Sequence, residues 1–228
     1  VPDEWINRVF SRMAHPMSGM SHHTYIILTK RPERILKGHA ERFAEWKNIW
    51  LGVTAENQKA ADERIPVLLQ VPAAVRFVSV EPMIGPVDLR FLQPSDPPCE
   101  IDALNGTHGV LRPHRGENNK INWVICGGES GPGARPMQPD WARRLRDQCK
   151  QASVPFFFKQ WGEWVDFQDA TGPDHPAGSS FTGPIHRFKD GKEMIRVGKK
   201  RAGRLLDGKT WDRFPTTTRT GNERKKER

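Results

Sequence analysis

Five short apolar runs, separated by segments of helical periodicity, constrain the fold of this chain more than any other feature. Each run is rich in β-branched or aromatic residues and is followed by polar, Gly or Pro residues. The runs are His23–Thr29, Ile49–Thr54, Val75–Val80, Trp123–Gly128 and Pro155–Lys159. They are apolar nearly throughout instead of alternating, which is typical of strands buried on both faces of a parallel sheet. We therefore predict five parallel strands.

Four segments outside these runs have the apolar spacing of amphipathic helices. They are Asp3–Met13, Pro32–Trp46, Asn57–Gln70, in which Pro66 is expected to kink or end the regular part, and Pro139–Ala152. The first three strands start 26 residues apart, about the length of a strand, a helix and two short loops. Repeated βα units predict an α/β fold: a partial parallel (β/α) barrel or an open parallel sheet of about five βα units.

The step from the third to the fourth run is 47 residues, and the surplus is polar and rich in Gly and Pro. We expect an inserted, mobile loop over about residues 93–120. The predicted organisation is a partial barrel over 1–188, a basic C-terminal extension over 189–215 packed on it, and a disordered tail over 216–228.

The charge of the chain lies mainly at its C-terminal end. The net charge is +9, and the segment from Lys189 to Arg228 holds 14 basic and 6 acidic residues, so the first 188 residues are nearly neutral. A chain that is basic overall would suggest a nucleic-acid-binding domain, but the charge here is unevenly placed. The excess therefore belongs to a tail, which is either simply solvated or a phosphate-binding arm.

The cysteine pattern argues against a disulfide scaffold and against a metal clip. Cys99, Cys126 and Cys149 lie 27 and 23 residues apart, which matches neither a C-x-x-C metal site nor a redox pair. We predict reduced thiols and a cytoplasmic protein. No apolar run approaches the ~20 residues of a membrane span, and no signal-peptide pattern opens the chain, so no membrane partner is expected.

Polar residues directly after the apolar runs are the candidate site, because ligands bind at the carboxyl ends of strands in βα folds. Three glutamates (Glu56, Glu81 and Glu129) and three cations (Lys30, Arg31 and Lys159) are expected at this edge. They could bind a zwitterionic or phosphorylated ligand, or hold a carboxylate at a raised pKa for proton transfer. Alternatively, the glutamates cap helices or pair with the cations structurally.

The stretch Gly127–Pro136 (GGESGPGARP) is the most distinctive local feature. Backbone N–H groups of such a loop can hold an anion, although a tight structural turn is the alternative. The loop has neither the Walker A order nor G-x-G-x-x-G, which disfavours nucleotide binding by those routes. Trp161 and Trp164, after the last run, could stack on a base or close the flank of the sheet.

Taken in order, several segments resemble one known family. They are LTKRPER (Leu28–Arg34), WLGVTAENQ–ADERIP (Trp50–Pro66), RFVSVEPMIGPVDL (Arg76–Leu89), WVICGGESGPGARPM (Trp123–Met137) and VPFFFKQWGEW (Val154–Trp164). The chain resembles the phage-associated family named after gene products thirty-seven and sixty-eight, a domain of unknown function related to radical S-adenosylmethionine (SAM) proteins. The likeness runs from Val1 to about Pro215, including VGKKRAGRLLDGKTWDRFP (Val197–Pro215).

The resemblance implies a partial (β/α) barrel preceded by three closely spaced cysteines that hold a [4Fe–4S] cluster open to SAM. That segment is absent here, and the spacing of Cys99, Cys126 and Cys149 cannot wrap one cluster. We therefore expect no cofactor on this chain alone, with SAM and [4Fe–4S] implied for the full-length protein. Because the sequence opens at Val1, we expect a fragment of a longer protein; a decayed copy is the alternative.

The resemblance also suggests roles for the residues at the predicted edge. We predict Glu81, Glu129 and Lys159 as catalytic residues, Thr54, Glu56, Gly127, Gly128 and Ser130 as cofactor-binding residues, and Thr29, Lys30, Arg31, Arg135, Gln160 and Trp161 as substrate-binding residues. The predicted function is the barrel portion of a radical-SAM-like enzyme, active only with the three-cysteine segment. The alternative is a non-catalytic scaffold that binds nucleic acid or a phage-encoded partner protein.

Overall fold

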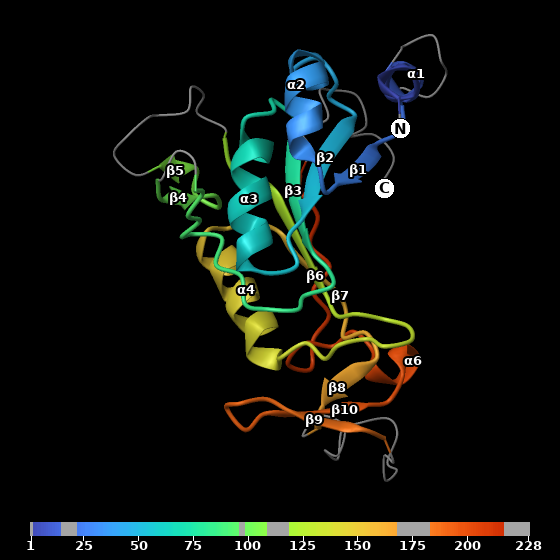
Figure 1. Cartoon of the computed structure of the whole chain (residues 1–228), viewed down its shortest axis with the longest axis vertical. Coiled ribbons are helices and arrows are strands. Elements are labelled where there is room, and N and C mark those ends of the chain that lie inside the picture. Colours follow the sequence, from blue (N-terminus) through green and yellow to red (C-terminus); the bar gives the residue numbers. More distant parts are fainter. Residues whose placement is uncertain (1, 15–21, 96–98, 109–118, 168–182, 217–228) are drawn as a thin grey trace, which may run out of the picture.

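A five-stranded parallel sheet is the centre of the fold in the computed structural model, which describes residues 2–14, 22–95, 99–108, 119–167 and 183–216. Its strands lie in the order β1-β2-β3-β6-β7 (Figure 1). They are β1 (Tyr25–Thr29), β2 (Ile49–Thr54), β3 (Val75–Val80), β6 (Trp123–Gly127) and β7 (Phe156–Gln160). The α/β prediction is confirmed, and the described strands form an open sheet rather than a closed barrel.

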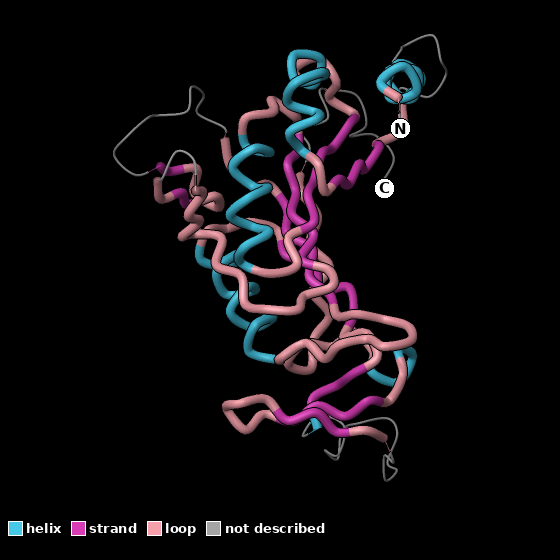
Figure 2. Tube along the Cα trace, in the orientation of Figure 1, coloured by secondary structure: helices cyan, strands magenta, loops and turns pink. Residues whose placement is uncertain are grey.

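Three helices cover one face of this sheet (Figures 1 and 2). They are α2 (Pro32–Phe43), α3 (Gln58–Leu69) and α4 (Pro139–Gln151). Because neighbouring strands follow one another along the chain, right-handed crossovers place every connecting helix on the same side. A further helix, α1 (Asp3–Ala14), packs on α2 through Phe10, whose ring lies 5.5 Å from that of Phe43.

Helix α3 departs from the expected effect of its proline. The side chain of Asn57 caps its first turn by accepting a hydrogen bond from the Ala60 N–H (3.0 Å), and the helix continues through Pro66 to Leu69. Pro66 therefore does not end the helix, and the alternative expectation, a kink, stays a prediction. Buried Ile65, Leu68 and Leu69 hold the last turn against the sheet, so tertiary packing outweighs the hydrogen bond that proline removes.

Apolar side chains are buried on both faces of the two central strands, β2 and β3. On the helix side, Leu51 and Val78 belong to the main core, and on the other side Trp50, Phe77 and Trp123 pack together. The prediction of burial on both faces is wrong for β1, where Ile26 and Leu28 are 52% and 49% exposed. β1 lies at the edge of the sheet, so it has a neighbouring strand on one side only.

The inserted segment contains ordered structure that its sequence did not indicate. β4 (Ile101–Asp102) and β5 (Thr107–His108) form an antiparallel pair, and Ile101 also exchanges two 3.0 Å backbone hydrogen bonds with Leu92. Ile101 and Leu104 are buried in the core. The predicted insertion thus contains two short strands within 99–108, which the sequence did not indicate because strands this short carry no readable periodicity, while its mobility stays a prediction; residues 96–98 and 109–118 lie outside the described part.

The C-terminal part builds a second small sheet and returns to the first. β8 (Trp164–Asp166), β10 (Glu193–Arg196) and β9 (Ile185–Arg187) form an antiparallel sheet, followed by α6 (Lys199–Ala202). The chain then runs along the edge of β7, where the Phe158 N–H donates to the Trp211 carbonyl (2.8 Å). The predicted disordered tail over 216–228 lies, apart from Thr216, outside the described residues.

None of the described helices is both long enough and apolar enough to cross a membrane.

A buried histidine between α1 and α2 makes the stability of this corner depend on pH. His39 is 5% exposed, its ring lies 5.3 Å from that of Phe10, and its Nδ1 atom has no hydrogen-bond partner within the described part of the chain. Burial lowers the pKa of His39, and the charges of Arg42 and Arg34 lower it further, against the opposite effect of Asp3.

We expect the free energy of unfolding to fall as the pH falls below about 6.5, because the unfolded chain then binds a proton that the folded His39 resists. His39→Leu should remove this part of the pH dependence. Urea denaturation at neutral pH and at about one unit below the ordinary histidine pKa measures it. An unchanged slope in the variant would contradict the assignment to His39.

Candidate functional site

The carboxylate of Glu81 is the centre of the cluster at the carboxyl edge of the sheet. Glu81 directly follows β3, and its Oε2 atom lies 3.1 Å from Nζ of Lys159 in β7. Nε2 of Gln160, at the end of β7, donates to Oε1 of Glu81 (3.3 Å) and to Oγ of Ser130 (3.2 Å). Three segments that are far apart in the sequence thus meet, as the rule for parallel strands predicts.

Gly127, at the end of β6, makes room for this cluster. A Cβ atom at residue 127 would lie 3.2 Å from Cδ of Glu81, closer than most packed atoms approach. The side chain of Glu81 is 18% exposed and that of Lys159 is 52% exposed. The pair is therefore partly shielded at the carboxylate and open to solvent at the ammonium group.

A second cluster surrounds Glu56, after β2. Nη1 of Arg64 donates to Oε2 of Glu56 (2.7 Å), and Nζ of Lys30 lies 3.4 Å from Oε1. Arg64 also donates to the carbonyl of Thr54 (2.8 Å). Burial is the largest single effect and raises the pKa of Glu56, but the hydrogen bond from Arg64, a backbone hydrogen bond and the charges of Arg64 and Lys30 together outweigh it, so that pKa lies below the ordinary value. Glu56 is therefore a paired anion.

Glu129 belongs to a third cluster and is fully occupied by one arginine. Arg135 donates to both carboxylate oxygens through its guanidinium and to Oε2 through its backbone N–H, each at 2.8 Å. This hydrogen bonding lowers the pKa of Glu129 to about 2. A carboxylate so acidic does not take up a proton near neutral pH, which argues against the predicted acid–base role.

The second and third clusters lie at the same edge. The hydrogen bond with Glu129 is the main cause of the raised pKa of Arg135, and the charge of Glu56 contributes as well. The backbone connects the clusters too: the Ile84 N–H donates to the Glu56 carbonyl and the Met83 N–H to the Gly127 carbonyl, both at 2.9 Å. The three clusters therefore lie near one another along the same edge of the sheet.

The glycine-rich loop uses its N–H groups inside the protein. Gly128 N–H donates to the Gln160 carbonyl (2.9 Å), and Gly131 N–H donates to Oε1 of Glu163 (3.2 Å). These two donors are not free for an anion, which favours a structural turn at this point. Of the other predicted residues, Thr29 accepts a hydrogen bond from the Arg31 N–H (3.0 Å) at the start of α2.

Trp161 lies in the core and not at the charged edge. Its side chain is 1% exposed, its indole N–H donates to the Leu205 carbonyl (2.7 Å), and its ring lies 5.0 Å from that of Phe158. A substrate ring cannot reach a buried indole face, so the prediction that Trp161 binds substrate by stacking is wrong. Trp164 is 9% exposed and also packs in the core.

Comparison with known protein families shows which family this chain belongs to. A family model described as a protein of unknown function (DUF5131) matches residues 1–215. The chain belongs to this family. No curated protein and no solved structure matches the chain. Membership of an uncharacterised family is thus confirmed, and the phage origin and the relation to radical SAM proteins stay predictions. All residues of the three clusters lie within the region that matches the DUF5131 model.

The cysteines of this DUF5131 protein do not fit an iron–sulfur cluster. Cys126 and Cys149 are buried, and burial raises the pKa of both thiols. Within the described ranges, no group of three or more His, Cys, Asp or Glu side chains is placed to hold a metal ion. Cluster chemistry is therefore not assigned to these residues.

Sequence reasoning missed one functional partner, Arg64. The search covered residues just after strands, whereas Arg64 lies inside α3 and reaches back to Glu56. Glu56 itself precedes the helix, so no helical spacing in the sequence indicated this pair.

Proposed function

We propose that the edge of the sheet around Glu81 and Lys159 binds a zwitterionic, amino-acid-like ligand. The observation that supports this most directly is the pairing of opposite charges from β3 and β7 across the side-chain-free Gly127. Parallel sheets bind their ligands at this edge.

The charges of the pair suit a ligand that carries both signs. An ammonium group would pair with Glu81 and a carboxylate with the half-exposed Lys159, so one ion pair is exchanged for two. Gln160, itself bonded to Ser130, holds the Glu81 carboxylate in position. A phosphate alone would gain Lys159 but face the negative charge of Glu81, which argues against a purely anionic ligand.

The methionyl part of SAM carries an ammonium group and a carboxylate, and Glu81 and Lys159 fit these two groups. When bound, SAM supplies an activated sulfonium centre. The chain's own residues bind and orient the amino-acid end of the ligand. The [4Fe–4S] cluster implied by the resemblance is not part of this proposal, because the described cysteines do not fit it.

Isothermal titration calorimetry with SAM, S-adenosylhomocysteine and methionine tests the proposal. We expect at least one of them to bind, and Glu81→Gln and Lys159→Ala each to weaken binding about tenfold or more, the usual effect of losing a charge-assisted hydrogen bond. Lys59→Ala, whose side chain is 86% exposed on α3, is the matched control and should bind as the wild type does. Binding to none of the three, or equal binding by all variants, would refute the proposal.

A second candidate function is supported by a different observation. Lys199, Lys200 and Arg201 of α6 are exposed, and none of them forms an ion pair with another described residue. Cations without partners favour an anionic macromolecule over a small zwitterion. This alternative, a nucleic-acid-binding scaffold, does not need the Glu81 cluster.

A further inference from the structure

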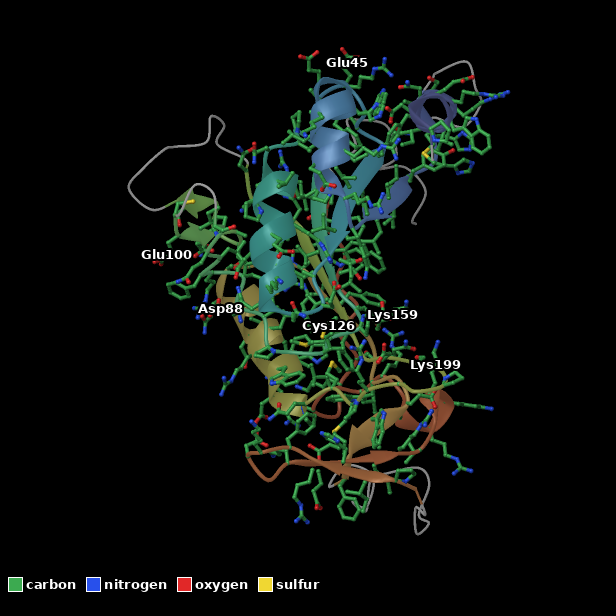
Figure 3. All side chains as sticks on the ribbon, viewed as in Figure 1. Glu45, Asp88, Glu100, Cys126, Lys159 and Lys199 are labelled. Carbon is green, nitrogen blue, oxygen red and sulfur yellow. The ribbon has the colours of Figure 1, made fainter. Side chains whose placement is uncertain are left out.

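A group of cations lies at the end of the carboxyl edge that is farthest from Lys159. β1 and β7 are the two outer strands of the sheet; Lys30 directly follows β1, whereas Lys159 belongs to β7. In Figure 3, Lys159 lies beside Cys126, at the ends of β7 and β6. Because β2, β3 and β6 lie between the two lysines, a ligand on the cations after β1 need not occupy Lys159.

Lys30 is held only loosely by its carboxylate partner. Its Nζ atom lies 3.4 Å from Oε1 of Glu56, and its side chain is 59% exposed. The other oxygen of Glu56 accepts a 2.7 Å hydrogen bond from Arg64, whose side chain is 19% exposed. An exposed ion pair contributes little to stability, and Glu56 keeps Arg64 when Lys30 turns away. Lys30 can therefore exchange Glu56 for an external anion at small cost.

Arg31 adds a second cation directly beside Lys30. Its side chain is exposed and forms no ion pair with any residue in the described ranges. Its backbone N–H donates to Oγ1 of Thr29 (3.0 Å), which fixes the chain where it leaves β1. The guanidinium is thus tethered at a defined place on the edge and faces solvent without a carboxylate partner from the described part of the chain.

The carboxylates along this edge are recessed, whereas the cations are exposed. The side chain of Glu56 is 18% exposed against 59% for Lys30, and in the neighbouring cluster Glu129 is 25% exposed against 56% for Arg135. A molecule that approaches from solvent therefore meets the positive groups first. Charges of one sign at a partly shielded surface attract a ligand of the opposite sign.

Positive charge is in excess at the β1 end. Lys30, Arg31 and Arg64 stand against Glu56, and the exposed Glu33 in the first turn of α2 reduces this excess without cancelling it. The pair at the other end, Glu81 with Lys159, is neutral in sum. A purely anionic group that Glu81 would repel is therefore attracted to the β1 end.

We propose that the cations at this end of the edge, Lys30 and Arg31 foremost, bind the phosphate group of a small phosphate monoester. Such a group carries nearly two negative charges near neutral pH and three strong acceptor oxygens. An arginine donates to two of these oxygens in parallel, and a lysine adds a point charge. A phosphodiester carries one charge per phosphate and matches two adjacent cations less well. This inference goes beyond the proposed function and does not rest on it.

Isothermal titration calorimetry with ribose 5-phosphate tests the proposal, with ribose as the matched sugar without phosphate. We expect ribose 5-phosphate to bind and ribose not to bind. Replacing Lys30 and Arg31 together by alanine should weaken binding about a hundredfold, since each charge-assisted hydrogen bond contributes about tenfold. Lys30→Arg should keep most of the affinity, because it keeps both the charge and the donors.

A matched control replaces two other cations, Lys37 and Lys59, by alanine. Both are exposed, on α2 and α3, and this double variant has the same net charge as the first. It should bind ribose 5-phosphate as the wild type does, and thermal denaturation verifies that each variant folds. Equal weakening by the two double variants would overturn the proposal, as would a wild-type protein that binds no ribose 5-phosphate or binds ribose equally well.

The dependence of binding on pH identifies the monoester. Its second proton binds with a pKa of about 6, whereas lysine and arginine stay charged, so affinity should fall roughly fourfold between about pH 7 and about pH 5.5. An affinity that does not change over this interval would contradict binding of the dianion. An oligonucleotide without a terminal phosphate that binds as tightly, and is weakened equally by the Lys30 and Arg31 double variant, would assign these cations to a nucleic acid and overturn the proposal.

A titration in the presence of the zwitterion separates this inference from the proposed function. Ribose 5-phosphate should bind with nearly unchanged affinity to protein saturated with whichever of SAM, S-adenosylhomocysteine and methionine binds. Displacement of one ligand by the other would show a single shared site and refute a separate phosphate site. If none of the three zwitterions binds, the proposed function fails alone, because the titration of ribose 5-phosphate decides the phosphate site by itself.

Discussion

Replacing Gly128 by alanine is expected to lower the free energy of unfolding by at least about 3 kcal/mol, the upper part of the range for overpacking. A Cβ atom at Gly128 would lie 1.8 Å from the carbonyl oxygen of Trp161 and 2.6 Å from its carbonyl carbon. Both are backbone atoms, so no side-chain rotation relieves the overlap. Urea denaturation followed by tryptophan fluorescence measures the loss.

The opposite loop has the same close backbone contact at Gly162, so neither glycine has room for a Cβ atom. A Cβ atom there would lie 2.1 Å from the Glu129 carbonyl oxygen, and the φ of Gly162 is +84°, which also favours glycine. Separating the two loops would move Ser130 away from Gln160. Gly128→Ala should therefore also abolish the ligand binding proposed for Glu81.

Gly38→Ala is the matched control for this substitution. Gly38 lies exposed in α2 with nothing within 4 Å of its added Cβ, so alanine should stabilise the protein by roughly 0.5–1 kcal/mol through helix propensity. The same substitution is thus expected to lower the free energy of unfolding at Gly128 and to raise it at Gly38. Equal stability of the two variants would show that the loops after β6 and β7 separate at little cost.

The strands were predictable because each apolar run is nearly continuous. β2 and β3 begin and end at the predicted residues, Ile49–Thr54 and Val75–Val80. The run of β1 was equally apolar, and yet half of it faces solvent. Burial depends on the neighbours that a strand finds in space, and a run of apolar residues does not specify whether it becomes a central or an edge strand.

The candidate site was predictable as far as it depends on strand ends. Glu81, Lys159 and Gln160 meet because parallel strands bring their carboxyl ends together. Which cation pairs with which glutamate at this edge was not predictable, because it depends on how far each side chain reaches. Glu56 pairs with Arg64 of a helix, and Glu129 pairs with Arg135 of its own loop. Ion pairs of this kind follow from three-dimensional geometry that the spacing of residues leaves open.

Replacing Trp161 distinguishes most clearly between a structural role and a ligand-binding role for one side chain. Trp161→Ala is expected to lower the free energy of unfolding by about 3–5 kcal/mol, the usual cost of removing a large buried aromatic side chain. The variant loses contact with Phe158 and leaves the Leu205 carbonyl without its indole donor. Trp5→Ala is the control, since Trp5 is 60% exposed on α1 and its loss should cost less than about 0.5 kcal/mol.

The two outcomes of this comparison assign Trp161 to different physical roles. Unfolding at lower denaturant concentration for Trp161→Ala alone places the side chain in the core that joins β7 to the C-terminal segment. A stable Trp161→Ala protein with reduced ligand binding would instead assign the indole to the ligand site. The 1% exposure of the side chain argues against that outcome. Because the indole N–H of Trp161 donates to the Leu205 carbonyl (2.7 Å), loss of the side chain should loosen the segment that follows α6. Trp161→Ala should therefore also weaken the nucleic-acid binding of the second candidate function, through the placement of Lys199, Lys200 and Arg201 and without any contact to the nucleic acid.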